Sequence, residues 1–243
     1  SLGYAVCAVV FGYVLKTFGS DLTIWLILGV VLVSLVFSFF IGDYQATLRK
    51  FEFRGLWELL RRRETLVFFG LIMVISVAHR TNEGFLSIAM REIGADDSVI
   101  GYASLASAVS EIPMFFLLAK FGHRFREYPL LAIASAFYVI RLGLLSLADE
   151  PWMMVALQMT HAITFAIFYI TALRGLQALI PDEYRSSGQA VFAVVWSGLA
   201  GVIAGTLGGW LYDSFGLSRV FQTGAVFALI GMIGFLIAHV RRR

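Results

Sequence analysis

The chain has 243 residues, of which 59% are hydrophobic and only 14% are charged, and its formal net charge at pH 7 is +3. Its mean hydropathy is +0.83. A soluble domain carries about a quarter of charged residues, so this composition excludes an ordinary soluble domain and predicts a polytopic membrane protein. Cys7 is the single cysteine, so no disulfide forms within the chain.

Apolar runs of about 20 residues are long enough to cross a bilayer as helices, and eight runs of this kind follow one another along the chain. They are residues 1–17, 22–41, 65–90, 100–120, 129–148, 152–173, 188–212 and 220–240. Most connections between them are short, which favours antiparallel neighbours. The fold class expected is therefore an all-α membrane protein with eight transmembrane helices.

The longest connection, residues 42–64, is charged, and we interpret it as a loop. Phe51, Leu56, Leu59 and Leu60 recur in it at roughly helical spacing. A charged segment with such an apolar stripe predicts an amphipathic helix on the membrane surface.

Basic residues are distributed unequally between the two sides that eight antiparallel spans define. Lys16, Arg91 and Arg219 fall on one side, and Arg80 and Arg141 lie inside spans. Cytoplasmic loops carry the excess of Lys and Arg, so we expect both chain ends to be cytoplasmic, in a plasma membrane such as the bacterial inner membrane. The richer side holds Arg49, Lys50, Arg54, Arg61, Arg62, Arg63, Lys120, Arg124, Arg126, Arg174, Arg185, Arg241, Arg242 and Arg243.

The first and seventh runs resemble one another. The segment LGYAVCAVVFGYVLKTFG begins at Leu2 and LAGVIAGTLGGWLYDSFG begins at Leu199; both end in Phe-Gly, and Gly12 matches Gly209. The offset of 197 residues equals about six spans with their loops. This spacing predicts a twelve-helix protein built from two six-helix halves.

On this interpretation residues 1–41 are the last two helices of an N-terminal bundle, and residues 42–64 are the cytoplasmic loop between bundles. Residues 65–243 are then the complete C-terminal six-helix bundle. Residue 1 is Ser rather than Met and lies in the first run. We therefore expect that four preceding helices of the same protein are missing; an eight-span protein with a trimmed terminus is the alternative.

Ionisable side chains interrupt the later runs, where each costs about 2.5–3.5 kcal/mol at the bilayer centre on insertion scales. Glu111, Arg141 and His161 lie near the middle of three consecutive runs, so we expect them at similar depth. A glutamate that meets an arginine in one conformation only would change its affinity for a proton, and a histidine can relay one. A satisfied polar network that fixes helix register is the alternative. Polar neighbours at helical spacing are Tyr138, Gln158 and Thr164.

A second polar group lies nearer the end of the third run. His79 and Glu83 are four residues apart, and Arg80 and Glu83 three apart, so each pair shares a helix face. We expect these three residues either to take part in transport or simply to pair locally and reach water.

Glycines repeat every four residues in the seventh run, at Gly201, Gly205 and Gly209. A face of small residues allows close approach between membrane helices, so we expect tight packing there.

Several segments resemble the C-terminal part of transporters of the major facilitator superfamily, in the group of lactose-permease-like and phenylpropionate-permease-like symporters. They are SEIPMFF with Glu111, YVIRLGLL with Arg141, MTHAITF with His161, and LIPDEYRSSGQA with Arg185 before GTLGGWLYDSFG. The resemblance covers almost the whole chain and implies the twelve-helix fold of that superfamily. It also implies alternating access between the two halves.

Two departures accompany this resemblance. Lactose-permease-like proteins also place a histidine in the span that contains His161 here, and their coupling acid follows that histidine by three residues. This chain has Thr164 at the corresponding position, so Glu111 becomes the better candidate for the proton carrier. The loop LAKFGHRFRE resembles the superfamily's Gly/Asp/Arg motif and keeps Gly122 and Arg124, but it lacks the Asp.

These features together predict a secondary active transporter, a proton symporter of a small organic solute. Arg141 would bind an anionic or hydroxyl-rich substrate and Glu111 would carry the proton. The alternatives are an exporter of amphipathic compounds on the same fold and a receptor or scaffold without transport. Metalloprotease, nucleophile-elbow and P-loop motifs are absent from the sequence, so we expect no enzyme, cofactor, metal or nucleic-acid partner. The partners expected are the bilayer, the solute, protons and the four missing helices.

Overall fold

Helices make up almost all of the computed structural model, which describes residues 2–40 and 53–241. No strand occurs in these two ranges. Short segments join some of the helices: η1 (Gly122–Arg124), η3 (Asp182–Tyr184) and two π-helical segments, η2 (Ala162–Ala166) and η4 (Val194–Leu199). The α-helices are α1 (Leu2–Ser38), α2 (Phe53–Leu60), α3 (Arg63–Glu92), α4 (Asp97–Phe121), α5 (Glu127–Leu145), α6 (Pro151–Gln158), α7 (Ile167–Leu179), α8 (Arg185–Ala193), α9 (Ala200–Phe215) and α10 (Leu217–Arg241).

Seven helices of the described chain are long and apolar enough to cross a membrane. They agree with the expected runs from 22–41 onward, and the expected run 1–17 is the first segment of α1, which is helical but is not among the seven. The all-α membrane class expected from the sequence is confirmed. The seven are Asp21–Ser38, Arg63–Glu92, Asp97–Arg124, Glu127–Leu145, Pro151–Leu179, Asp182–Phe215 and Leu217–Arg241.

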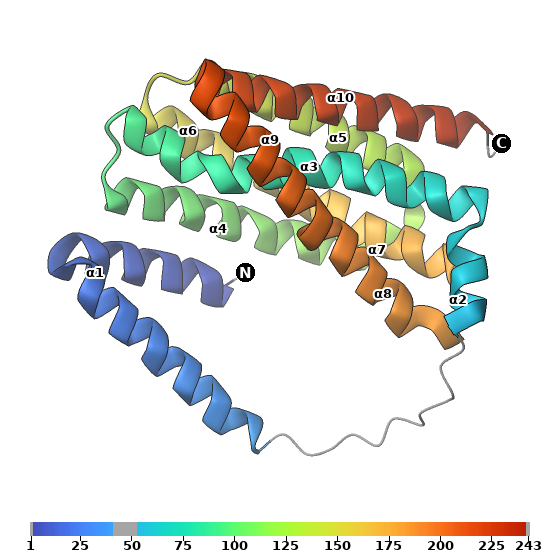
Figure 1. Ribbon diagram of the computed structural model, residues 1–243, viewed down its shortest axis with the longest axis horizontal. Coiled ribbons are helices and arrows are strands. Elements are labelled where there is room, and N and C mark those ends of the chain that lie inside the picture. The colour runs from blue at the N-terminus through green and yellow to red at the C-terminus, as the bar shows by residue number, and fades with distance from the viewer. Residues whose placement is uncertain (1, 41–52, 242–243) are drawn as a thin grey trace.

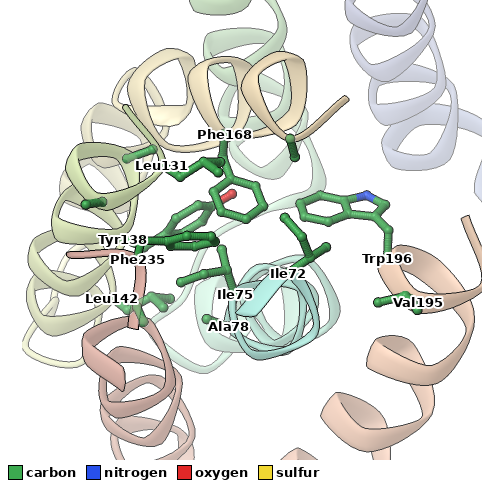
Figure 2. Packing of buried hydrophobic residues seen from close by; sticks show 14 of the residues in the cluster. Ile72, Ile75, Ala78, Leu131, Tyr138, Leu142, Phe168, Val195, Trp196 and Phe235 are labelled. Atoms are coloured by element: carbon green, nitrogen blue, oxygen red, sulfur yellow. The ribbon is translucent and has the colours of Figure 1, made fainter. Parts of the chain in front are cut away.

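α3 lies at the centre of the bundle. α10 packs against α5 and α3, α9 crosses α3 obliquely, and α4 packs against α6 and η2 (Figure 1). The core that joins these helices is formed by side chains such as Ile72 and Ile75 of α3, Leu142 of α5, and Phe168 of α7 (Figure 2). Trp196 of η4 stacks on Phe168 with ring centroids 5.7 Å apart, which ties the seventh run to this core.

Glycines set the distance between α10 and α3. A Cβ on Gly231 would lie 2.3 Å from Cδ1 of Ile75, and one on Gly234 would lie 2.2 Å from Cδ2 of Leu71. Real Cβ atoms do not approach other atoms so closely, so these two positions admit no larger side chain unless Ile75 and Leu71 move.

The close packing expected at Gly201, Gly205 and Gly209 is not made within the described chain, where nothing lies within 4 Å of a Cβ built on any of them. The neighbouring stripe, Ala200, Ala204 and Gly208, faces the bundle instead. A Cβ on Gly208 would lie 2.4 Å from Phe85 of α3. Both stripes contain small residues at four-residue spacing, so the spacing alone does not select the one that faces the bundle.

The two segments compared in the sequence end in the same backbone conformation. α1 breaks at Gly19, with φ 79° and ψ −176°, and α9 ends at Gly216, with φ 79° and ψ 173°. A positive φ of this kind favours glycine. The first segment of α1 then packs along α4, where a Cβ on Gly12 would lie 3.1 Å from the carbonyl oxygen of Asp97. The second segment points away from the bundle, and its apolar window contains no buried residue (Figure 1).

The loop expected at residues 42–64 contains a short amphipathic helix, α2. Leu59 is buried, whereas Trp57 is exposed, so α2 has one enclosed face and one open face. Phe51, Arg49, Lys50, Arg242 and Arg243, which entered the sequence interpretation, lie outside the described residues.

Candidate functional site

Arg141 is completely enclosed in the bundle, with 1% of its surface exposed. Its Nη1 donates a hydrogen bond to Oγ1 of Thr164 at 2.9 Å and lies 2.7 Å from Nδ1 of His161. Its Nη2 donates to Oε1 of Gln158. The single guanidinium of α5 therefore holds three side chains of the next membrane span in place.

These contacts determine which nitrogen of His161 carries the proton. A guanidinium can only donate hydrogen bonds, so Nδ1 of His161 must accept, and the ring proton is on Nε2. Nε2 lies 3.2 Å from Oε1 of Glu111 on α4. His161 thus connects the cation of α5 to the carboxylate of α4, and a second ring proton would be placed against the guanidinium.

A second polar chain begins at Tyr138, which is also buried on α5. Its hydroxyl lies 3.0 Å from Nδ1 of His79, whose Nε2 lies 3.3 Å from Oε1 of Glu83. The other carboxylate oxygen of Glu83 accepts from Nη1 of Arg80 at 2.6 Å. Arg80 reaches on to Oγ of Ser197 in η4 at 2.6 Å, so this chain joins α5, α3 and the seventh span.

The two chains meet at their histidines. The rings of His79 and His161 stack with centroids 5.7 Å apart, and Phe165 stacks on both, at 5.2 Å and 5.1 Å. Trp196 also stacks on the ring of His79, with ring centroids 4.8 Å apart. His79, which the sequence placed in a second polar group, therefore lies in the same cluster as Tyr138 and His161.

Both π-helical segments border this site. His161 immediately precedes η2, which contains Thr164 and Phe165, and η4 contains Trp196 and Ser197. An extra residue in a helical turn changes the direction of the side chains around it, and such segments are frequent at functional sites. Sequence reasoning missed Phe165, Trp196 and Ser197, because aromatic and serine residues are too common in apolar helices to stand out.

A cavity of about 490 Å³ opens beside the two chains, within the size range of small-molecule sites. Eight of its ten lining residues are polar or ionisable, and both Glu83 and Glu111 are among them. Arg141 and Tyr138 are not among the lining residues; they lie behind Gln158 and His161. The lining consists of Asn82, Glu83, Leu86, Ser87, Ser104, Ser107, Glu111, Gln158, His161 and Phe165.

Two buried amide atoms on this lining have no hydrogen-bond partner among the described residues. They are Oδ1 of Asn82, an acceptor, and Nε2 of Gln158, a donor. Oε1 of Gln158 is already engaged by Arg141 and by Oγ of Ser107 at 3.3 Å. Both atoms are buried, so they lie beneath the cavity surface although their residues line it.

The loop after α4 is organised by a residue that the motif did not single out. Arg174 of α7 donates to the carbonyl oxygens of Gly122 and Phe125 and lies 3.0 Å from Oε1 of Glu127. Arg124 instead stacks over the ring of Phe121, at 5.3 Å. Of the two residues of the expected motif, Gly122 is therefore bound by Arg174, whereas Arg124 is not.

Arg185, the remaining candidate, pairs with Asp182 at the exposed start of the seventh span. Arg185 is not among the residues that line the cavity. Within the described ranges, no group of three or more His, Cys, Asp or Glu side chains could hold a metal ion.

Comparison with known proteins gives a family match over most of the chain. The MFS_1 like family matches residues 1–223. The probable 3-phenylpropionic acid transporter of Escherichia coli (strain K12) is 29% identical over 171 residues, 70% of this chain and 44% of that protein. The maltose permease of Geobacillus stearothermophilus is 24% identical over 180 residues, 74% of this chain and 44% of the permease.

A third relative is the uncharacterized transporter YwbF of Bacillus subtilis (strain 168), 19% identical over 182 residues, 75% of this chain and 45% of that protein. The chain thus spans less than half the length of each of these relatives. The resemblance inferred from the sequence segments is confirmed, and together with the seven apolar helices it identifies an integral multi-pass membrane protein.

Proposed function

The chain belongs to the MFS_1 like family, and we propose that it forms part of a secondary active transporter that couples proton movement to uptake of a small organic solute. The observation that carries the proposal is the line of contacts from Arg141 through His161 to Glu111, enclosed in the bundle beside a polar cavity. Charged groups within a membrane domain are costly and generally serve transport.

The contact between Glu111 and His161 provides a switch for the proton. The ionised carboxylate accepts a charge-assisted hydrogen bond from Nε2 of His161. A proton bound to Glu111 removes the negative charge and weakens this bond, which loosens α4 from the sixth span at the cavity. Alternating access would rock the two halves of the protein around this site.

The cavity supports a hydroxyl-rich, uncharged solute over an anionic one. Glu83 and Glu111 both line it, while Arg141 lies behind the lining. Hydroxyl groups of a solute can donate hydrogen bonds to both of these carboxylates. An exporter of amphipathic compounds would be expected to have a wider and more apolar cavity.

The repeat supports the presence of four further helices outside this chain. Gly12 contacts α4 closely, and Gly209, which matches Gly12 in the repeat, has an open face. A helix of the other half would pack on Gly209, and on Gly201 and Gly205, as α1 packs on α4. Residues 1–41 would then be the last two helices of the N-terminal bundle, and residues 65–243 the C-terminal bundle.

The basic ends of α3, α4 and α10 would face the cytoplasm in the bacterial inner membrane. Arg61, Arg62, Arg63, Lys120 and Arg241 belong to this side. The opposite ends carry Glu92, Asp96 and Asp97, in agreement with the preference of basic residues for the cytoplasm.

The test uses the full-length protein that contains this chain, reconstituted in liposomes with an imposed pH gradient. Radiolabelled maltose and 3-phenylpropionate, suggested by the relatives, are the first two solutes of the panel. Proton-dependent accumulation of a sugar is the expected result. If solutes bind but do not accumulate at any pH gradient, the result would favour a receptor over a symporter.

A further inference from the structure

A second and larger crevice, of about 700 Å³, opens between α3, α5 and α10. Its lining residues lie at the end of the bundle where α3 begins and α10 ends; Figure 1 shows these two helix ends. None of its lining residues lines the polar cavity beside Glu111. It is therefore a separate feature of the fold, and the proposed transport chemistry makes no use of it.

The sequence explains why the crevice opens there. α10 touches α3 closely at Gly231 and Gly234. Gly234 is also in the lining, and the residues that follow it toward the chain end, Ile237 and Ala238, complete the wall on α10. The two helices thus meet at the glycines and leave a gap between their ends.

The mouth of the crevice is basic. Arg63 at the start of α3 and Arg241 at the end of α10 both line it, and Arg61 and Arg62 directly precede α3. Glu64 is the acidic residue of the lining. The lining itself therefore contains two arginines and one carboxylate, a net positive charge. A guanidinium binds phosphate oxygens through two parallel hydrogen bonds.

The walls of the crevice are apolar and continue onto the outer surface of the bundle. Val67 and Leu71 form the wall on α3, and Val67 is 45% exposed. Ile237 on α10 is 49% exposed, and Ile233, one turn earlier, is also exposed. A water-soluble anion would match the arginines only, whereas a lipid would match both the charged mouth and these side chains.

We propose that this crevice binds an anionic phospholipid. The headgroup phosphate lies between Arg63 and Arg241, and an acyl chain follows Val67 and Ile237 along the bundle. Basic crevices between membrane helices bind acidic headgroups in this way. A zwitterionic lipid offers the same phosphate together with a cation that the arginines repel, so the site selects for net negative charge.

The experiment is native mass spectrometry of the full-length protein in detergent, with dioleoylphosphatidylglycerol or dioleoylphosphatidylcholine added at equal concentration. We expect retention of one phosphatidylglycerol in preference to phosphatidylcholine by about tenfold, since each arginine near an anionic headgroup adds about a fivefold preference before screening. The double substitution Arg63→Gln with Arg241→Gln should abolish the preference. A hundredfold excess of inorganic phosphate should leave lipid binding intact.

The matched control removes two arginines at the opposite end of the bundle, Arg91→Gln with Arg219→Gln, and should keep the preference. A third variant, Ala238→Phe, keeps every charge and fills the crevice, and it should lose the retained lipid. Unchanged preference in the Arg63 and Arg241 variant, equal loss in the control, or displacement by phosphate would each overturn the proposal. Thermal melting of every variant without lipid distinguishes lost binding from lost folding.

Discussion

His79 and His161 stack with ring centroids 5.7 Å apart and ring planes 25° apart, although they belong to the third and sixth expected spans. Each ring also contacts its own carboxylate, Glu83 for His79 and Glu111 for His161. The stacking therefore makes the two polar chains dependent on each other, because a displacement of one ring moves the surface against which the other ring packs.

Glu111→Gln is the most direct test of coupling. The amide keeps the shape of the side chain but cannot take up and release a proton, so pH-driven accumulation should fall by a factor of about 100 or more, while exchange of solute across the membrane continues. Removing a positioned proton acceptor usually costs two to four orders of magnitude. The measurement compares accumulation with counterflow in liposomes. The control is Glu92→Gln, which alters the contact with Tyr212 at the far end of α3. Normal accumulation by Glu111→Gln would show that Glu111 does not carry the coupled proton.

Arg141→Lys tests whether the fork of the guanidinium is needed. An ammonium is a single point donor and cannot hold Gln158, Thr164 and His161 in the same arrangement. We expect transport to fall at least about tenfold, which is about 1.4 kcal/mol, through displacement of the cavity lining. Measured uptake and solute affinity that match the parent protein would show that the geometry of this residue is unimportant.

Tyr138→Phe removes the hydroxyl next to Nδ1 of His79 and leaves the ring packing on Phe168. A lost buried hydrogen bond costs about 0.5–1.5 kcal/mol, so the melting temperature should fall by a few degrees. If the His79 chain also takes part in transport, the pH dependence of uptake should shift. Tyr102→Phe, on the exposed face of α4, serves as the control, and a pH profile that does not move in Tyr138→Phe would leave His79 with a structural role only.

Gly208→Ala and Gly209→Ala separate packing within the chain from packing outside it. The methyl group at position 208 would meet Phe85 at 2.4 Å, and overpacking typically costs about 1–3 kcal/mol. The same change at position 209 meets nothing in the described chain. Gly208→Ala should therefore lower the melting temperature both of the 243-residue chain and of the full-length protein. Gly209→Ala should lower it only in the full-length protein, and equal tolerance of Gly209→Ala in both would argue against a helix packed on that face.

The ion pair between Lys16 and Asp96 joins α1 to the start of α4, with 2.8 Å between Nζ and Oδ2. The hydrogen bond from Lys16, aided by the backbone N–H of Val99, holds the pKa of Asp96 below its usual range. A depressed folded-state pKa gives stability that is present above the unfolded pKa and is lost as pH falls through the folded value. Lys16→Met should therefore lower the melting temperature less at strongly acidic pH than at neutral pH. An effect that does not change with pH would show that this ion pair does not contribute to stability.

Much of the fold was accessible from the sequence because each span must be a long apolar run. The expected runs from 22–41 onward agree with helices of the structure, since water is absent from the bilayer core and every backbone group must bond within its own helix. The Phe-Gly pairs that served only to align the two segments coincide with positive-φ glycines at Gly19 and Gly216, which the sequence did not predict. The position of the packing stripe on α9 was not predicted either, because Ala200, Ala204 and Gly208 look as suitable as the three glycines beside them.

From the sequence, the candidate site could be predicted only as a set of charged residues whose burial in a membrane is costly. Glu111, Arg141 and His161 were identified because charge within an apolar run is rare, and the structure places them in contact. Arg174 and Trp196 gave no such signal. Arg174 entered the sequence analysis only as one of the basic residues that set the orientation, and Trp196 is one of many aromatic residues in apolar runs.

The sequence by itself determined the class of protein, the spans and the residues that carry charge into the membrane, because hydrophobic length and the cost of burying charge act on each helix separately. Only the tertiary structure decided that Arg141 lies behind the cavity while Glu111 lines it, and that His79 joins the same site. Those relations depend on how helices rotate and pack against one another, and packing is set by contacts such as Gly208 with Phe85 and Gly231 with Ile75, which no single run of residues contains.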